Sequence, residues 1–312
     1  MSHHKQCFRL VNGIFLLNKS KGVSSNYVLQ RVKYLFAARK AGHTGSLDPL
    51  ATGVLPVCFG EATKLSRYLL DSDKGYHSVF KLGVETDTGD SEGRIVSIID
   101  ASTITEGLIR ATIDQFLGDT VQVPPMYSAL KRNGQPLYKY ARKGMDIERS
   151  PRPITIYEFK VVSFKSGVAP ELEVKIRCSK GTYIRSLASD LGRLLGCGAH
   201  MIKLHRFAVG PFSDDMSVSL SELRKCYDSH GITACDERLL PVDHALNATP
   251  KVALDEKSAA RLQQGQSVFL SKGFNLAGEG DIVRVFDNNL MFLGVGILRS
   301  GGMLVPKRLV AL

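Results

Sequence analysis

The chain has 312 residues, and its 44% hydrophobic content is sufficient for a folded protein with more than one core. Lysine and arginine number 41 against 30 aspartates and glutamates, so the formal net charge of +11 makes a polyanion the first partner to consider. No apolar stretch reaches the ~18 residues of a membrane span, and residues 1–10 lack the hydrophobic core of a signal peptide. We therefore expect a cytoplasmic protein without a membrane segment.

The six cysteines, at positions 7, 58, 178, 197, 226 and 235, are predicted to be reduced thiols. None has the C-x-x-C spacing of a zinc site or a redox motif. Cys226, His230 and Cys235 are close enough in sequence to suggest a metal site, but no second pair of ligands accompanies them. We therefore predict no metal ion.

Apolar residues at helical spacing predict helices that begin at Ser24 or Ser25, after Gly60, at Thr105 and near residue 184. The positions expected to face the core are Val28, Val32 and Leu35 in the first helix, Leu65, Tyr68 and Leu69 in the second, Leu108, Ile109, Ile113 and Phe116 in the third, and Ile184, Leu187, Ala188, Leu191, Leu194 and Leu195 in the fourth.

Runs rich in β-branched and aromatic residues predict strands at 76–84, 94–99, 154–164 and 171–178. These strands occur in clusters, not in strict alternation with helices. We therefore expect an α+β fold in which helices flank a mixed, largely antiparallel sheet. Ser219 with Glu222 has the spacing of a capping box, which predicts the start of a further helix.

A separate small domain is predicted at the C-terminal end. After residue 247 the sequence changes to one short helix, 256–264, followed by glycine-punctuated strands at 282–286 and 291–298. We expect a larger domain over residues 1–247 and a β-barrel-like domain over residues 248–312.

Residues 131–152, KRNGQPLYKYARKGMDIERSPR, hold seven lysines or arginines against two acidic residues and so contribute +5 of the net charge of +11. Pro136 and Gly144 bracket a short basic helix. Exposed tyrosines can stack on bases while the cations neutralise phosphates, so the segment predicts a clamp for RNA or DNA; a solvated charged helix is the alternative. The residues assigned to the clamp are Lys131, Arg132, Tyr138, Lys139, Arg142 and Lys143.

The segment CSKGTYIRSLASDLG, 178–192, places Arg185 in the first turn of a helix, where its charge opposes the helix dipole. This position is favourable only if the guanidinium has an anionic partner, either a phosphate or a buried carboxylate; a surface arginine is the alternative. The segment ETDTGDSEG, 85–93, lacks the spacing of a calcium loop and predicts a polar hairpin loop.

The segment AGHTGSLDPLATGVLP, 41–56, places Asp48 in a run that we predict to be too irregular for a strand or a long helix. Local rules predict that Asp48 caps a short helical turn over residues 50–52, with Pro49 first in the turn and Gly53 ending it. The alternative is a catalytic carboxylate, because the same glycines and prolines can form a rigid loop that holds Asp48 in a cleft.

Several segments resemble motifs of the TruB family of tRNA pseudouridine synthases. GHTGSLDPLATGVLPVCFGEATK resembles the family's catalytic-aspartate motif, and DSDKGYHSVFKLGVETDTGDSEG is similar to its tyrosine-bearing strand and polar loop. QVPPMYSALKRNGQPLYKYARKG with RPITIYEF resembles the RNA-gripping insertion, at about 124–152, and CSKGTYIRSLASDLG with CGAHMIKLHRFAVGPF resembles the arginine motif and the closing strand. The sequence from about residue 250 resembles a PUA-type RNA-binding domain, so the resemblance covers nearly the whole chain.

The chain departs from the family pattern at two places. Asn18-Lys19-Ser20 stands where the family usually has Asp-Lys-Pro, and Ser46 stands where threonine is commoner. The first change removes a proline from a turn but no chemical group, and the second keeps the hydroxyl. The expected reaction is therefore unchanged.

The resemblance implies that the chain isomerises uridine 55 in the T-arm loop of tRNA to pseudouridine, by base flipping. No atoms are gained or lost in this reaction, so no cofactor is expected. Asp48 matches the family's nucleophile, Arg185 the cation that pairs with it, and Tyr76 the tyrosine that stacks on the flipped uracil and assists with the C5 proton. The expected substrate-binding residues are His43, which fills the place of the flipped base, Tyr183 and Leu204 as pocket walls, and Lys19 and Lys64 as structural or phosphate contacts.

The expected partner is the T-arm stem-loop of tRNA, bound by a monomer without a guide RNA, because the chain lacks the long basic tails of guide-dependent relatives. One alternative is a non-catalytic RNA-binding protein, which would not need Asp48, Tyr76 and Arg185 together. A hydrolase that uses Asp48 is another, but the second carboxylate or metal cluster of such enzymes is missing.

Overall fold

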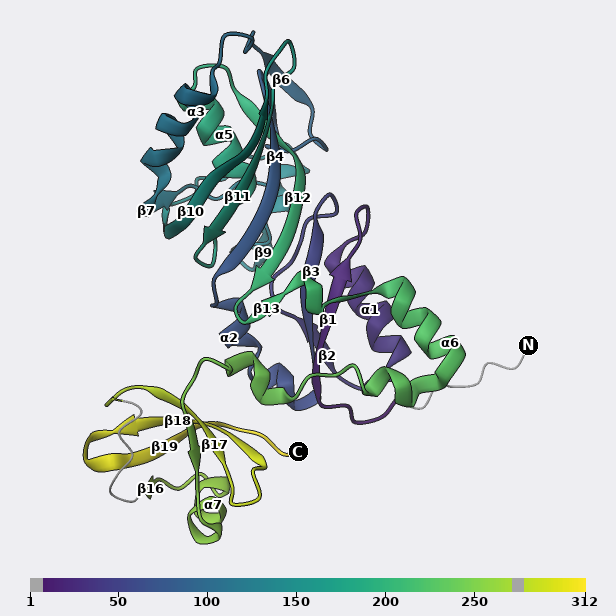
Figure 1. The fold of residues 1–312 in the computed structure, drawn as a ribbon, viewed down its shortest axis with the longest axis vertical. Helices are drawn as coiled ribbons and strands as arrows, with labels where there is room; N and C mark the ends of the chain where they lie inside the picture. The colour runs from purple at the N-terminus through teal and green to yellow at the C-terminus, as the bar shows by residue number, and fades with distance from the viewer. Residues whose placement is uncertain (1–7, 271–277) are drawn as a thin grey trace. The chain divides into compact units, whose positions relative to one another are not determined.

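The computed structural model describes residues 8–270 and 278–312, which divide into two compact units (Figure 1). Unit 1 consists of the described residues of Met1–Asp48, Val54–Leu70 and Val209–Leu312, and unit 2 consists of Pro49–Gly53 and Asp71–Ala208. Residues 1–7 lie outside the described residues, and with them Cys7 and most of the segment 1–10 in which no signal peptide is expected.

Unit 2 is built on five strands in the order β12-β4-β11-β10-β7 (Figure 1). Their bounds are β4 (Lys74–Leu82), β7 (Gly118–Gln122), β10 (Arg152–Lys165), β11 (Glu171–Cys178) and β12 (Ala199–Val209). The pairs β4–β11, β11–β10 and β10–β7 are antiparallel, whereas the first two residues of β3 (Thr52–Phe59) pair in parallel with β12. The predicted mixed, largely antiparallel sheet is confirmed.

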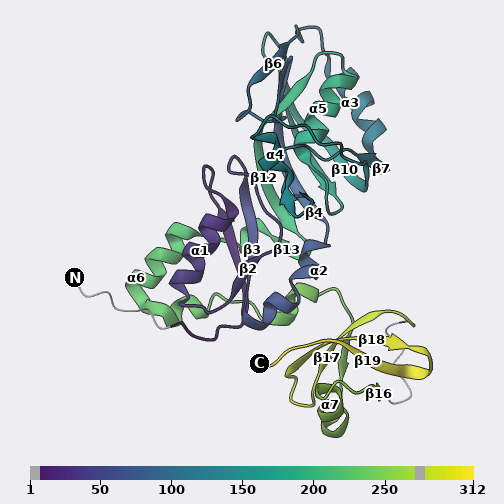
Figure 2. The ribbon, with the colours of Figure 1, turned by 180° about the vertical axis from the view of Figure 1, so that it is seen from behind.

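Side chains alternate along β11, as expected for a sheet with one covered face. Leu172, Val174 and Ile176 are buried, whereas Lys175 and Arg177 are more exposed. Helix α3 (Glu106–Ile113) contacts β10, helix α5 (Ile184–Leu194) contacts β4, and the two helices lie side by side (Figure 2). The other elements of unit 2 are β5 (Val84–Thr86), β6 (Ile95–Ile98), η2 (Asp114–Phe116), β8 (Lys131–Arg132), β9 (Gln135–Pro136) and α4 (Leu137–Ala141).

In unit 1, β1 (Gly13–Lys19) lies between β14 (Val218–Ser219) and β3. Helices α1 (Ser25–Leu35) and α6 (Leu220–Asp236) contact each other. Both predicted helix starts are confirmed, because the Ser24 hydroxyl accepts a hydrogen bond from the Tyr27 amide and Ser219 forms a capping box with Glu222. The other elements of this part are β2 (Ala41–His43), η1 (Gly60–Lys64), α2 (Ser66–Leu70), β13 (Phe212–Ser213), η3 (Asp214–Met216) and η4 (Val242–Leu246).

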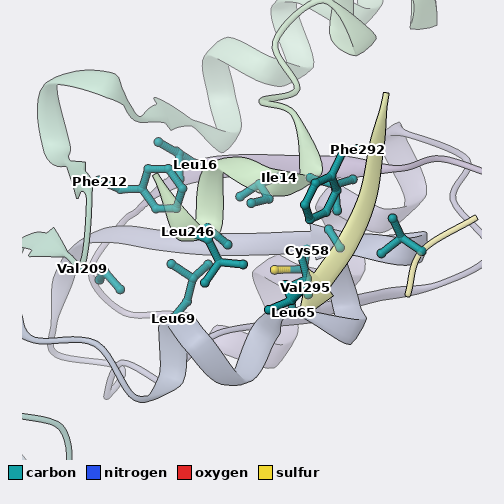
Figure 3. Close-up of a cluster of buried hydrophobic side chains, with 14 of the residues drawn as sticks. Ile14, Leu16, Cys58, Leu65, Leu69, Val209, Phe212, Leu246, Phe292 and Val295 are labelled. Carbon is teal, nitrogen blue, oxygen red and sulfur yellow. The ribbon is translucent and has the colours of Figure 1, made fainter. Parts of the chain in front are cut away.

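The C-terminal part of unit 1 is a five-stranded sheet in the order β15-β17-β18-β19-β16, which confirms the predicted small β-barrel-like fold. Its elements are β15 (Lys251–Ala253), α7 (Glu256–Gln263), β16 (Val268–Phe269), β17 (Ile282–Phe286), β18 (Phe292–Arg299), η5 (Ser300–Gly302) and β19 (Met303–Leu309). Phe292 and Val295 of β18 belong to the same buried cluster as Ile14, Leu16 and Leu65 (Figure 3). The C-terminal sheet therefore shares a hydrophobic core with the N-terminal elements of its unit.

Two predicted core positions are wrong. Leu108 is 48% exposed, because α3 packs through Ile109, Thr112 and Ile113. Leu194 is 54% exposed at the end of α5. Helical spacing identifies the apolar face of a helix, but the neighbouring elements decide which residues of that face they bury. Leu108 and Leu194 are the residues left exposed.

Close packing of α5 makes Gly192 sensitive to substitution. A Cβ atom at this position would lie 2.1 Å from the Ala199 amide nitrogen, so Gly192→Ala should reduce the free energy of unfolding by about 1–3 kcal/mol. Gly107→Ala in α3 is the matched control, because no neighbouring atom lies within 4 Å of its added Cβ and alanine favours helices by up to about 1 kcal/mol. Urea unfolding of both variants measures the difference; a Gly192→Ala protein as stable as the control would contradict the prediction.

Candidate active site

The loop that carries Asp48 is held through the backbone of its neighbours. The buried hydroxyl of Ser25 donates to the Leu47 carbonyl (3.0 Å) and accepts from the Leu47 amide (2.8 Å). The Thr44 amide donates to the Pro56 carbonyl at 3.1 Å. Asp48 is half-buried, and Leu47 before it is buried. The backbone of the loop that carries Asp48 is therefore held by tertiary contacts.

The predicted bounds of the helical turn, residues 50–52, are wrong, because the turn after Asp48 covers residues 49–50 and β3 begins at Thr52. Thr52 and Gly53 pair with His205 and Arg206 of β12, and this pairing makes them part of a strand. That Asp48 caps the turn stays a prediction. Gly53 has φ +105°, and a Cβ atom would lie 2.2 Å from the Arg206 carbonyl oxygen. Only glycine fits this position.

The prediction that residues 41–56 contain no strand is also wrong. Residues 41–43 form β2, which pairs antiparallel with residues 57–59 of β3. The partner strand lies beyond the irregular run, so a local reading of the sequence does not reveal the pairing.

Arg185 lies buried at the start of α5, with a side-chain exposure of 6%. Its Nε atom is 3.6 Å from Asp90 Oδ2. Its Nη1 donates to the Thr88 carbonyl (3.3 Å), and its Nη2 donates to the Tyr127 carbonyl (2.8 Å). The prediction that Arg185 has a buried anionic partner is confirmed, and one such partner is Asp90. The pairing of Arg185 with Asp48 stays a prediction.

Asp90 is a residue of the site that the sequence analysis missed. The predicted hairpin is confirmed, since β5 and β6 pair on either side of residues 87–94. Asp90 is nevertheless 4% exposed and accepts hydrogen bonds from the Thr88 hydroxyl (2.6 Å) and the Glu92 amide (3.0 Å). No local pattern in the loop distinguishes this buried carboxylate from its exposed neighbours.

Tyr76 on β4 and Leu204 on β12 lie on neighbouring strands and are 9% and 8% exposed. Arg206, two residues after Leu204, is almost fully buried. Burial lowers the pKa of its guanidinium, and attraction and a hydrogen bond to Tyr76 act in the opposite direction. Arg206 therefore holds the phenol of Tyr76. The sequence does contain a signal for Arg206. It stands two residues after the apolar Leu204, so in a strand both side chains face the core.

Lys74 lies two residues before Tyr76 on β4 and is 8% exposed. Burial, and then repulsion from Arg206, lowers its pKa to about 8. Its Nζ donates to the Ser72 carbonyl. Cys178 stands opposite Lys74 in the β4–β11 ladder, and burial raises the pKa of its thiol to about 12, so the thiol is neutral at pH 7.

The residues predicted for catalysis and substrate binding fall in both units. Unit 1 contains Lys19, His43, Asp48 and Lys64, and unit 2 contains Tyr76, Tyr183, Arg185 and Leu204. The chain passes from unit 1 into unit 2 immediately after Asp48. The roles of these residues stay predictions.

The unit 1 lysines and His43 differ in burial. Lys19 is fully buried and its Nζ donates to the Ser20 carbonyl at 2.9 Å. Lys64 forms an ion pair with Glu61 (2.6 Å) and donates to the Leu309 carbonyl (3.2 Å), so it joins η1 to β19. His43 is half-buried at the end of β2.

The predicted basic helix of the insertion is present as α4, followed by Gly144 with φ +72°. The five cations assigned to the clamp are all exposed at the surface: Lys131, Arg132, Lys139, Arg142 and Lys143. Tyr138 is half-buried, with the Arg142 guanidinium carbon 5.4 Å from its ring centre. The insertion therefore presents its positive charge to solvent.

Among residues 8–270 and 278–312, no group of three or more histidine, cysteine or acidic side chains is arranged to hold a metal ion. The five cysteines of the described chain are free thiols. Within the same ranges, no helix combines the length and apolarity needed to span a bilayer.

The sequence matches three family descriptions in succession: TruB family pseudouridylate synthase (N terminal domain) over residues 33–184, tRNA pseudouridylate synthase B C-terminal domain over 185–247, and Pseudouridine synthase II TruB, C-terminal over 250–310. The chain is similar to tRNA pseudouridine synthase B of Saccharophagus degradans, with 52% identity over 100% of this chain and 99% of that protein. It is similar to tRNA pseudouridine synthase B of Actinobacillus pleuropneumoniae, with 46% identity over 99% of each.

Among solved structures, the chain resembles one in the "Structure of H/ACA RNP bound to a substrate RNA containing 2'-deoxyuridine". The TM-score is 0.72 at 22% identity, and the match covers 96% of this chain and 85% of the other. This likeness shows that the two chains share a fold.

The buried ammonium of Lys74 predicts a pH dependence of stability. Its pKa is lowered in the folded state, so at this lysine the unfolded chain binds more protons between about pH 8 and 10.5, and Lys74 should contribute a gain in stability as the pH rises through this range. The buried thiols of Cys58 and Cys178, whose pKa values are raised, contribute in the opposite direction above about pH 9, so the gain is measured as the difference between the wild type and the variant. Lys74→Met should remove the gain, which amounts to about 3 kcal/mol, and should be more stable than the wild type at pH 7. Urea unfolding from pH 7 to 10.5 measures this. Lys160→Met, at an exposed lysine of β10, is the control and should keep the wild-type profile; identical profiles for both variants would refute the assignment.

Proposed function

Because the chain belongs to the TruB family of pseudouridine synthases, we propose that it converts uridine 55 in the T-arm loop of tRNA to pseudouridine with Asp48 as the nucleophile. The chain is a pseudouridine synthase that acts on RNA. The observation that supports Asp48 most directly is the double hydrogen bond between Ser25 and Leu47, which fixes the residue before a half-buried carboxylate. A nucleophile must be held in this way for attack.

The reaction breaks the bond between uracil N1 and the ribose, rotates the base, and joins its C5 to the same ribose carbon. The proton lost from C5 is balanced by the proton gained at N1, so the reaction needs neither an oxidant nor a cofactor. Asp48 attacks either the ribose or the base, or assists departure of the base, and its carboxylate must be ionised to do so. In a site that excludes water, a cation has to offset its desolvation, and Arg185 is the proposed cation.

Tyr76 is proposed to stack on the flipped uracil and to assist with the C5 proton. The hydrogen bond between Arg206 and the Tyr76 phenol supports this role, because it keeps a cation beside the phenol oxygen. Leu204 and Tyr183 are proposed as further walls of the pocket. Flipping a base costs a few kcal/mol in lost stacking, and the ring of His43 is proposed to fill the vacated place in the RNA.

The insertion at 124–152 is proposed to grip the T-arm. We propose that it belongs to a catalytic domain over residues 1–247, which is followed in the sequence by a PUA-type domain over 248–312. A folded RNA loop is recognised by its shape and its phosphates, which suits surface cations on a short helix and hairpin. We propose that the protein acts as a monomer in the cytoplasm, without a guide RNA.

Asp48→Asn should abolish release of tritium from a T-arm stem-loop labelled at uridine C5, while leaving the dissociation constant for RNA largely unchanged. The change removes the nucleophile and keeps the size of the side chain. Asp228→Asn, on the surface of α6, is the matched control and should release tritium at the wild-type rate. Undiminished release by Asp48→Asn would exclude it as the nucleophile, and binding without release by the wild type would indicate a binding protein.

Salt dependence tests the clamp. Replacing Lys131, Lys139 and Lys143 with alanine should weaken RNA binding and reduce the slope of log K against log salt concentration by about 0.7–0.9 for each phosphate that the variant no longer neutralises. The control removes the same charge elsewhere, through Lys160, Lys165 and Lys203, which are exposed on β10 and β12. Equal effects of the two triple variants, or a wild-type affinity that does not respond to salt, would refute the clamp.

A further inference from the structure

The insertion is fastened at its root to the start of α5. Gln122 is the last residue of β7, directly before the insertion, and is 4% exposed. Its side-chain amide oxygen accepts from the Tyr183 amide (2.8 Å), and its nitrogen donates to the Tyr183 carbonyl (3.1 Å). A single side chain therefore holds both polar backbone groups of the residue that precedes α5.

A primary amide suits this position because it is a donor and an acceptor at once. Tyr183 is the N-cap residue of α5 and has no side-chain cap, so its amide needs a partner outside the helix. Its carbonyl also accepts the first hydrogen bond of the helix, from Leu187 at 3.1 Å. Gln122 thus satisfies both backbone groups of the residue at which α5 begins, and Arg185 lies in the first turn that follows.

The same root also contacts Arg185 directly. The Tyr127 carbonyl accepts a hydrogen bond from Arg185 Nη2 at 2.8 Å, and the Val123 carbonyl lies 3.5 Å from the Ser186 hydroxyl. Residues 122–127 are therefore attached to three residues within the first turn of α5 and its cap. The position of the Arg185 guanidinium depends on where this root lies.

Further contacts extend from the root to the basic helix. The Leu137 amide donates to the Leu130 carbonyl (2.7 Å), and the Tyr138 amide donates to the Ser128 carbonyl (3.1 Å). These bonds join the first residues of α4 to the segment that begins at Tyr127. A continuous set of backbone contacts thus connects the cations of the insertion to Arg185.

We propose that Gln122 is a positioning residue, which holds the root of the insertion and Arg185 in one arrangement, so that RNA gripped by the insertion meets a correctly placed guanidinium. The proposal rests on the proposed function, because it takes Arg185 as the partner of Asp48 and the insertion as the RNA clamp. Gln122 acts through Arg185 and touches no substrate atom. Its loss affects the chemical step more than the binding of RNA.

The test compares Gln122→Met with wild type in single-turnover tritium release and in RNA binding by filter retention. Methionine is of similar length but forms neither hydrogen bond with Tyr183. The rate constant should fall by about tenfold or more, equivalent to at least about 1.4 kcal/mol, with the dissociation constant for RNA changed by no more than about twofold. Gln122→Glu keeps the acceptor and loses the donor. It replaces Gln122→Met in the test if that variant does not fold, and its rate constant for tritium release should fall as well.

Thr112→Val is the matched control for a structural effect, because Thr112 is also 4% exposed and its hydroxyl donates within α3, to the Leu108 carbonyl at 2.8 Å. It should keep the wild-type rate. A folded Gln122 variant with the wild-type rate, or a Thr112→Val variant that loses as much, would overturn the proposal.

A double-mutant cycle gives the second readout. In an Arg185→Lys background, the guanidinium that Gln122 positions is already gone, so Gln122→Met should cause little further loss of rate. Fully additive losses would overturn the proposal. Failure of the proposed function is recognised separately, because the wild type would then release no tritium from the T-arm RNA.

Discussion

A buried guanidinium is the constraint around which unit 2 is organised. Arg185 is 6% exposed, and a charge removed from water requires anionic and carbonyl partners on every side. Asp90 and Thr88 come from the loop between β5 and β6, and Tyr127 comes from the root of the insertion. Satisfying one side chain therefore brings together three segments that are far apart in the sequence. This arrangement explains why a helix tolerates an arginine in its first turn.

The structure holds the proposed catalytic residues through the backbone of nearby residues. Ser25 makes two hydrogen bonds to Leu47, the residue before Asp48, and Gln122 makes two to Tyr183, close to Arg185. Each contact fixes a residue through both its amide and its carbonyl, so the backbone close to the charged side chain is held in place. Such preorganisation lowers the cost of orienting groups during the reaction.

Features that depend on neighbours in sequence were predicted well. The cap at Ser24, the capping box at Ser219 and Glu222, the short basic helix and the C-terminal strands all follow from local rules. One local signal was overlooked: Asn133-Gly134 has positive φ at both residues and connects β8 to β9, as expected for this dipeptide in a hairpin. The missed strands at 41–43 and 52–56 depend instead on ladder partners elsewhere in the chain.

The sequence by itself determined the family, the mixed sheet with its C-terminal β-rich part, and the presence of a basic insertion, because motifs, periodicity and charge are written in consecutive residues. Only the tertiary structure decided that Asp90 and Arg206 are buried beside Arg185 and Tyr76, and that Asp48 lies in a loop between β2 and β3 whose turn ends before Thr52. The burial of a side chain and the identity of its hydrogen-bond or ion-pair partners depend on segments that come together only in the folded protein. A carboxylate in a polar hairpin and a cation in a strand therefore gain their roles only when the chain has folded.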